Sequence, residues 1–538
     1  MNMRKFLYHA LIVGFVLFSL APTFYELSRM GDLKPERNFE LVHNFPTDYN
    51  FYLSRIKQGM EGRWTVVERY TSEPHTGGFI HGFYLLLGQI GRYAGVPLGR
   101  EADVYHVARV VLGVALLVAT LEFCKGTMGT KGAWGILAFL LAVTASSFPK
   151  LVEVNGVWRF GGYMAWWSVM DSLQRITFIP HILAGQVMIV FLIRELGELR
   201  ELREKMWSVV FLGMLAFVLG MVFPPGLVFV IGVIGALWVL QGRNTKEIIP
   251  YGAVFLMGSA ALVYLALMTS FYPWKRLAEV DVIRPLPFDF IEYAKAVGVM
   301  GVIGVFGGIW AMIKREKTLY PAIAWEVAWI GFLIIFRFVP QQSPLRFSEM
   351  VPHIPLAVLS AYLLKKIGEI RGMRAIGAGM AVVLVASGLF HMYSSFLWQK
   401  DFIDHKIRAT LPLVPTGSFV MYPLKDFIAA MGYIWDATRG EGVIITETTA
   451  GNYIPARTGN SVYMGHDNTV RFEEKKVSVK QFFSGKMNEA WLRETHASYI
   501  FFGPQEREDS GGKNLTTFYP FLQEVYKNNY VTIYKIIE

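Results

Sequence analysis

A carboxylate near the start of a predicted helix is the first residue whose type and position could support catalysis. The segment 45–60 opens with Phe45 and Pro46 and carries Asp48 in what would be its first turn. A carboxylate there can accept backbone N–H groups as a helix N-cap. Held at a membrane interface, it can instead act as a general base toward a hydroxyl group. The spacing alone leaves both interpretations open.

The same segment has the pattern of a helix that lies on a membrane surface. Its apolar residues fall on one helical stripe, and its charged residues turn away from that stripe. The stripe comprises Tyr49, Tyr52, Leu53, Ile56 and Met60, and the charged residues are Arg55, Lys57 and Glu61. We therefore expect an amphipathic interfacial helix with a solvated polar face.

A second polar group follows in the segment 70–78, where Glu73 and His75 flank a proline. Two acids and a histidine, with Asp48 included, are ligand types that bind divalent metals, but their spacing is not that of a regular metal site. A polar turn is the alternative. The pattern is compatible with a divalent metal and does not imply one, so no cofactor is predicted from it.

A third polar group precedes a later apolar run. At helical spacing Arg346, Glu349 and His353 share one face, and an arginine near a helix N-terminus favours a phosphate group. A structural Arg346–Glu349 ion pair is the alternative. His181, at the start of another predicted helix, is expected to point toward the same entrance, with a purely structural histidine as its alternative.

Four further basic residues lie in the loops predicted to be outside the membrane. They are Arg159, Arg175, Lys275 and Arg276. We expect them to contact lipid phosphates without specificity.

The composition identifies the elements that must position these groups as membrane helices. The chain has 538 residues, of which 53% are hydrophobic and only 17% charged, which is too apolar for an ordinary soluble protein. The net charge of +10 comes from basic residues between apolar runs, so nucleic acid is not an expected partner. The single cysteine, Cys124, excludes an intrachain disulfide and a thiolate-rich metal site.

About eleven apolar runs are long enough to cross a bilayer. They cover residues 6–25, 104–124, 134–149, 176–193, 207–223, 226–241, 249–271, 294–313, 320–338, 353–364 and 375–393. With a cytoplasmic N-terminus every inner loop is basic, as the positive-inside rule requires. The loop 26–103 and the tail from about 395 then lie outside a cell membrane. We interpret 79–93 as a re-entrant or interfacial helix, because a full crossing would invert every later loop.

Glycines at positions 301, 304, 307 and 308 mark one of these runs. No strand precedes them, so they indicate close helix packing rather than nucleotide binding.

The tail has a different pattern. A helix at 424–437 precedes apolar runs at 443–446, 461–464, 499–502 and 530–537, with polar helical patterns at 473–484 and 488–496. This alternation predicts a small α/β domain. The expected division is therefore a transmembrane catalytic module, 1–394, and an extracytoplasmic domain, 395–538.

This arrangement resembles the polytopic, lipid-dependent glycosyltransferases of the GT-C fold, which include protein mannosyltransferases, aminoarabinose transferases and oligosaccharyltransferases. The architectural likeness covers the whole chain, and in detail it resembles a bacterial branch of that class. The local motifs that carry it lie at 48–56, 70–75, 180–181, 346–355, 454–459 and 462–466.

The resemblance implies an enzyme that moves a hexose or pentose from a polyprenyl phosphate or diphosphate to a glycan, lipid or protein acceptor outside the membrane. It implies Asp48 as general base and Glu73 as a second catalytic acid, although the adjacent acidic pair of the family is absent. It also implies that Arg346 and His353 neutralise the departing phosphate, with His75, His181 and Glu349 in the same substrate site. Asp48, Arg346 and His353 should then converge on one cavity.

Two other functions compete with this one. A transporter or flippase of lipid-linked glycans would use the same charges to line a path, but transporters place polar groups near the bilayer midplane, whereas these gather at one face. An assembly protein whose helices only anchor the tail would leave the polar entrance without a role.

Overall fold

The computed structural model describes residues 3–129, 133–154, 156–198, 206–242, 245–339, 341–410, 413 and 421–537. Parts of three loops that we predict to be cytoplasmic lie outside these residues. The chain folds into two compact units. We call Met1–Pro22, Ala108–Leu265 and Asp281–Gln399 the bundle unit, and Thr23–Val107, Ala266–Val280 and Lys400–Glu538 the loop–tail unit. The domain boundary expected at residue 394 stays a prediction.

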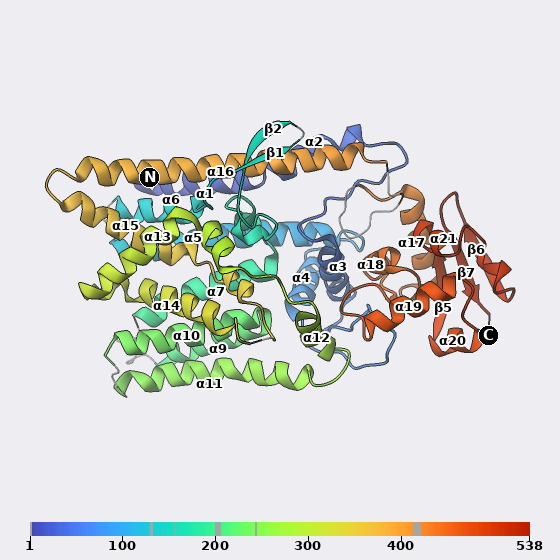
Figure 1. Ribbon diagram of the computed structural model, residues 1–538. Coiled ribbons are helices and arrows are strands. Elements are labelled where there is room, and N and C mark those ends of the chain that lie inside the picture. The colour runs from blue at the N-terminus through green and yellow to red at the C-terminus, as the bar shows by residue number, and fades with distance from the viewer. Residues whose placement is uncertain are drawn as a thin grey trace. The chain divides into compact units, whose positions relative to one another are not determined.

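Apolar helices supply the membrane segments (Figure 1). Six of those described have the length and hydropathy of a span. Five are α5 (Glu101–Met128), α7 (Pro180–Gly197), α11 (Thr245–Met268), α13 (Phe290–Ile313) and α16 (Arg374–Arg408), and the sixth is α14 (Tyr320–Ile335) together with the short 3-10 helix η4 before it (Lys317–Leu319). Two bent pairs also qualify, α1 with α2 (Met3–Ser19, Ala21–Ser28) and η5 with α15 (Pro344–Met350, His353–Glu369). Shorter apolar helices are α6 (Trp134–Thr144), α9 (Met206–Val222) and α10 (Pro224–Leu240). Each corresponds to one of the predicted runs, so a polytopic helical membrane fold is confirmed.

Glycines permit the closest helix contacts in the bundle unit. A Cβ at Gly307 of α13 would lie 2.2 Å from the carbonyl oxygen of Leu359 in α15, and one at Gly304 would lie 2.8 Å from that of Leu356. Only glycine allows two backbones to approach this closely. The predicted packing role is confirmed for Gly304, Gly307 and Gly308, whereas a Cβ at Gly301 would meet only Val297 of its own helix.

A β-hairpin that the hydropathy pattern did not predict lies between α6 and α7. Its strands are β1 (Lys150–Val154) and β2 (Val157–Gly161), which pair antiparallel. The carbonyl oxygen of Phe160 accepts hydrogen bonds from Ser394 and from the indole of Trp398, so the hairpin is fixed to α16. Short 3-10 helices η2 (Ser168–Met170) and η3 (Gln174–Thr177) complete this connection.

The loop–tail unit contains a five-stranded mixed sheet with the order β4-β3-β5-β7-β6, drawn in red in Figure 1. The strands are β3 (Val443–Ile445), β4 (Ser461–Val462), β5 (Ala497–Phe502), β6 (Leu522–Lys527) and β7 (Thr532–Ile536), of which β3 pairs parallel with β4 and β5. The helices of the tail are α17 (Lys425–Thr438), α18 (Thr448–Arg457), α19 (Phe472–Phe483), α20 (Glu489–Glu494) and α21 (Pro504–Asp509). The predicted α/β domain is confirmed, although β6, α18 and α21 were not anticipated.

The first outer loop shares a core with the tail. Its helices α3 (Pro46–Met60) and α4 (Gly82–Tyr93) cross closely, because a Cβ at Gly59 would lie 2.1 Å from the carbonyl oxygen of Leu85. Phe51 and Tyr70 of the loop pack in one buried cluster with apolar side chains of the tail. The same unit includes α12 (Lys275–Ile283) up to Val280. Loop and tail therefore form one folded body.

One part of the prediction for α3 is wrong, namely that its charged residues are solvated. Arg55 and Lys57 are 0% and 2% exposed instead of solvated. Each pairs with a buried carboxylate of the same unit, Arg55 with Glu68 at 2.5 Å and Lys57 with Glu101 at 3.3 Å. Charges that are paired in this way can be buried, which a helical pattern alone does not reveal.

Candidate functional site

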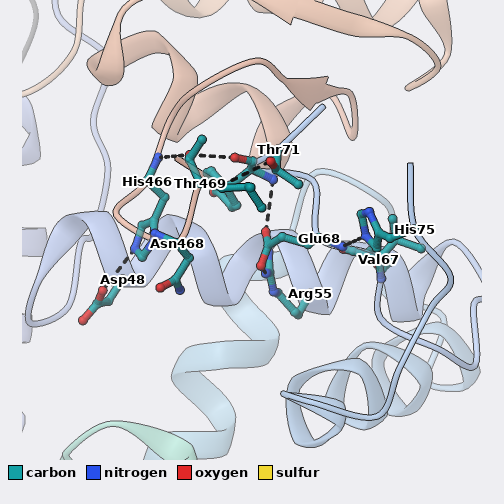
Figure 2. A network of polar contacts seen from close by, with 12 residues as sticks. Asp48, Arg55, Val67, Glu68, Thr71, His75, His466, Asn468 and Thr469 are labelled. Carbon is teal, nitrogen blue, oxygen red and sulfur yellow. Dashed lines mark hydrogen bonds and ion pairs between the residues drawn. The ribbon is translucent and has the colours of Figure 1, made fainter. Parts of the chain in front are cut away.

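Asp48 lies in the first turn of α3 with its side chain 43% exposed. The helix begins at Pro46, and its N-cap residue is Phe45, so Asp48 is not the N-cap. Its carboxylate faces a histidine of the tail instead, His466, whose Nε2 lies 3.3 Å from Asp48 Oδ1 (Figure 2). The structure therefore replaces the capping interpretation with a carboxylate–imidazole pair.

His466 is held on several sides. Its ring stacks on Phe51 with 4.6 Å between the ring centroids, and the side chain is 8% exposed. The backbone N–H of Asn468 donates to Nδ1 at 3.1 Å, so the neutral ring carries its hydrogen on Nε2, the nitrogen that faces Asp48. The backbone N–H of His466 donates to Thr469 Oγ1, which donates in turn to the carbonyl of Tyr70 (Figure 2). These contacts fix the ring of His466 with its Nε2 toward Asp48.

Both ring nitrogens of His75 contact the backbone of the loop that contains it. Its Nε2 accepts the backbone N–H of Glu68 at 2.9 Å (Figure 2). Its Nδ1 lies 2.8 Å from the carbonyl oxygen of Glu73. Glu68 in turn pairs with Arg55, and its Oε1 accepts from the backbone N–H of Tyr70 at 3.1 Å. Because both ring nitrogens of His75 have backbone partners, its geometry favours the polar-turn interpretation.

Glu73 joins the loop to the tail through an ion pair. Its Oε1 lies 2.8 Å from Nζ of Lys475 in α19, and Thr71 donates to its other oxygen. Burial opposes ionisation, but Lys475 and Thr71 outweigh it and lower the pKa of Glu73. Burial lowers the pKa of Lys475 despite its partner. This pair gives Glu73 a structural role that the sequence did not indicate.

In the bundle unit, Arg346 and Glu349 lie together on η5. Arg346 Nη1 is 3.7 Å from Glu349 Oε1, and Nη2 is 3.5 Å from Asp281 Oδ1. The guanidinium also lies 5.8 Å from the ring centroid of Trp167. The predicted Arg346–Glu349 pair is therefore present, with a second carboxylate beside it. An anion would have to compete with both carboxylates for the guanidinium group.

His353 opens α15 and lines a small recess with Arg175, Ser348 and Pro352. Arg175 is 7% exposed and donates to the carbonyl oxygens of Ala142 and Val143. Arg175 supplies the positive charge of this recess, and the imidazole of His353 lies beside it. The sequence showed Arg175 only as one of several loop cations.

The expectation of loose lipid contact is wrong for two of the four basic residues. Arg175 is buried as described above. Arg276 is 4% exposed, donates to the carbonyl oxygen of Asp467 and pairs with Glu473 at 2.9 Å. Buried guanidinium groups with fixed acceptors do not reach lipid head groups.

His181 is the second residue of α7, and its ring lies 6.5 Å from that of Phe223. It is not among the residues that line the recess of Arg175 and His353. Asp48, Glu73 and His75 belong to the loop–tail unit, whereas His181, Arg346, Glu349 and His353 belong to the bundle unit. The convergence of Asp48 with Arg346 and His353 stays a prediction.

Metal ligands do not gather within the described part of the chain, where no cluster of three or more histidine, cysteine or acidic side chains occurs. The basic groups that pair with Asp48 and Glu73 are an imidazole and an ammonium group. What the arrangement offers chemically is a partly exposed, oriented carboxylate.

The sequence missed His466 as a functional candidate. The residue lies in the motif 462–466 that contributed to the resemblance, but its partner is 418 positions away along the chain. Only the shared fold of loop and tail brings the two together.

Solved structures of other proteins share this fold, although no family model and no curated protein matches the sequence. An archaeal oligosaccharyltransferase, AglB from Archaeoglobus fulgidus in complex with an inhibitory peptide and a dolichol-phosphate, has a TM-score of 0.51 at 12% identity, over 97% of this chain and 73% of that chain.

Two further structures agree. An Archaeoglobus fulgidus oligosaccharyltransferase tethered to an acceptor peptide has a TM-score of 0.54 at 11% identity, over 97% of this chain and 72% of that one. ArnT from Cupriavidus metallidurans, bound to undecaprenyl phosphate, has a TM-score of 0.52 at 11% identity, over 99% of this chain and 98% of that one. The chain therefore has the GT-C fold, that of polytopic membrane glycosyltransferases.

Proposed function

We propose that this protein is a membrane glycosyltransferase that moves a hexose or pentose from a polyprenyl phosphate or diphosphate carrier to an acceptor hydroxyl outside the cytoplasm. The observation that carries the proposal is Asp48, a partly exposed carboxylate oriented by His466, in a chain with the GT-C fold. The solved neighbours support it, since one is bound to dolichol-phosphate and another to undecaprenyl phosphate.

The proposed reaction is a single displacement. Asp48 accepts the proton of the acceptor hydroxyl, whose oxygen attacks the anomeric carbon of the sugar. The bond from that carbon to the phosphate oxygen breaks, and the carrier phosphate leaves with the electron pair. Attack opposite the leaving group inverts the anomeric centre.

Cationic groups stabilise the charge that grows on the leaving phosphate in this scheme. Arg346 and His353 are proposed for this role, and Arg175 shares the recess of His353. Glu349 and His181 would support the same substrate site. Glu73 and His75 hold the loop that carries Asp48, a role that their ion pair and backbone hydrogen bonds favour over direct chemistry.

The test is turnover of polyprenyl-phosphate sugars by the full chain in liposomes, with membrane glycans, lipids or peptides as acceptors. Asp48→Asn should lower turnover by about 10²–10⁴-fold, the usual contribution of a general base. The matched control is Asp436→Asn, because Asp436 is an exposed acid of the tail. Equal turnover by Asp48→Asn and the wild type would refute the role of Asp48.

The rival transporter makes a different prediction. Flux of lipid-linked glycan across proteoliposomes without any sugar transfer, unchanged in Asp48→Asn, would favour it. The proposed orientation has its own test, since reporters fused after Lys205 and after Asp401 should lie on opposite sides of the membrane.

A further inference from the structure

One triplet of the sequence has the form Asn-X-Ser/Thr in which X is not proline. It is Asn514-Leu515-Thr516, and none of the other asparagines has serine or threonine two positions later. Such a triplet is the acceptor sequence for N-linked glycosylation when it lies in a surface loop outside the cytoplasm. A three-residue motif also recurs by chance, so its structural surroundings decide whether it can be modified.

The triplet lies in the tail, in the connection between α21 and β6. Gly511 and Gly512 turn the chain there with φ of +63° and +78°, and a Cβ at either position would meet nothing within 4 Å. Asn514 follows with an exposed side chain and precedes the 3-10 helix η6 (Leu515–Thr517). The asparagine therefore stands on a surface loop, as the acceptor sequence requires.

The side-chain amide of Asn514 is not used to hold this loop in the described part of the chain. It makes no capping hydrogen bond to η6, and it is the backbone carbonyl of Asn514 that accepts the N–H of Thr517 at 3.0 Å. By contrast, the amide of Asn528 donates to the carbonyl oxygen of Asp426 at 2.8 Å. A glycan on Asn514 would therefore break no hydrogen bond of the fold.

Leu515 anchors the triplet in the core, whereas the residues on either side of it face solvent. The leucine side chain is 0% exposed and packs in the buried cluster of the tail that contains Phe482 and Tyr519. Thr516 is exposed, as Asn514 is. Both side chains that define the acceptor sequence thus lie at the surface, and a bulky hydrophilic glycan there displaces no core residue.

We propose that Asn514 carries an N-linked glycan, attached by a separate transferase that takes its oligosaccharide from a lipid diphosphate carrier. The new bond joins Asn514 Nδ2 to the anomeric carbon, and the bond from that carbon to the diphosphate oxygen breaks. The lipid diphosphate leaves with the electron pair, and one amide proton passes to a base of the transferase. The inference rests on the extracytoplasmic position of the tail in the proposed function, but not on Asp48 as general base.

The test is the mass of the full chain, purified from a host that N-glycosylates proteins outside the cytoplasm. The wild type should carry a glycan that peptide-N-glycosidase removes, which leaves an aspartate in place of Asn514, detected by peptide mass spectrometry. Thr516→Ala should abolish the glycan, and Thr516→Ser should keep it, because serine retains the hydroxyl group. The matched control is Thr517→Ala, since Thr517 is an exposed threonine one residue outside the triplet, and it should leave the glycan unchanged. Because both threonines are exposed, the unfolding temperature of the deglycosylated chain should be the same in all variants.

An unmodified Asn514 in the wild type, or a glycan that survives Thr516→Ala, would overturn the inference. A second acceptor sequence, made by Ala490→Thr beside the exposed Asn488, identifies the reason for such a failure. Modification of Asn488 alone would show that the tail is outside and that Asn514 is not a site. Modification of neither would contradict the proposed orientation as well.

Asp48→Asn separates this inference from the proposed reaction. The variant should retain the glycan on Asn514, since a separate transferase attaches it. Loss of the glycan in this variant would mean that the chain modifies itself, which would overturn the assignment to a separate enzyme. Because the glycan is detected by its mass and not by turnover, equal transferase activity of Asp48→Asn and the wild type would refute the role of Asp48 and leave this inference intact.

Discussion

Replacing His466 by phenylalanine tests the Asp48–His466 pair most directly. The new ring can keep the stack on Phe51, which has 4.6 Å between centroids, but it removes the N–H that faces Asp48. A hydrogen bond to a charged group contributes about 1.5–3 kcal/mol. The contact of 3.3 Å is longer than the 2.7–2.9 Å of the strongest charge-assisted bonds, so the lower value applies.

About 1.5 kcal/mol corresponds to a roughly tenfold decrease in turnover. We expect kcat to fall by this factor in His466→Phe while KM for the lipid-linked sugar changes by less than about twofold, because the histidine orients the base without binding the carrier. His466→Gln, whose amide can donate from a similar position, should recover most of the activity. The assay is initial-rate transfer from a radiolabelled polyprenyl-phosphate sugar in liposomes.

A double-mutant cycle separates orientation from folding. If His466 acts through Asp48, the His466→Phe change should cost little in the Asp48→Asn background. Unchanged turnover in His466→Phe would refute the reasoning. An equal loss in the phenylalanine and glutamine variants, with a lower unfolding temperature in both, would show that His466 is only structural.

Three further predictions concern stability, each measured as the unfolding temperature of the full chain in detergent. Glu73→Gln should destabilise the protein by about 2 kcal/mol at neutral pH, because it leaves the buried Lys475 without its partner. The pKa of Glu73 is lower in the folded protein than its unfolded value of about 4.3. Ionised Glu73 therefore stabilises the fold above about pH 4.3, and this stabilisation is lost as the pH falls through the pKa of the folded state, a pH dependence that the glutamine variant should lack. Gly307→Ala should lower the unfolding temperature by several degrees, since its Cβ would meet the backbone of α15 at 2.2 Å. The control Gly331→Ala, whose Cβ would have nothing within 4 Å, should leave that temperature unchanged, and equal effects of the two variants would argue against the packing role of Gly307. Burial and the neighbouring Glu506 raise the pKa of Glu447 to about 8. Protonated Glu447 therefore favours the folded state at low pH, and this contribution to stability is lost as the pH rises from about 4.3 through 8. Glu447→Gln should raise the unfolding temperature at about pH 9 relative to the wild type, and no gain there would contradict this assignment.

Hydropathy was sufficient to predict the helical elements of the bundle, since each span must satisfy its backbone within itself and bury its apolar side chains in lipid or protein. The packing glycines of α13 and the alternating tail were predictable for the same reason, because their signals are local and periodic. The hairpin β1–β2 was not predicted, because apolar and polar residues do not alternate strictly along its strands.

Contacts between distant segments were decided by the tertiary structure alone. Arg55 and Lys57 could be recognised as buried only once their partners, Glu68 and Glu101, were in place. The pairing of Asp48 with His466 spans 418 positions and depends on the loop and tail sharing one core. Helical periodicity reports which face a residue occupies, but a charge can be buried only where the complete fold supplies its partner.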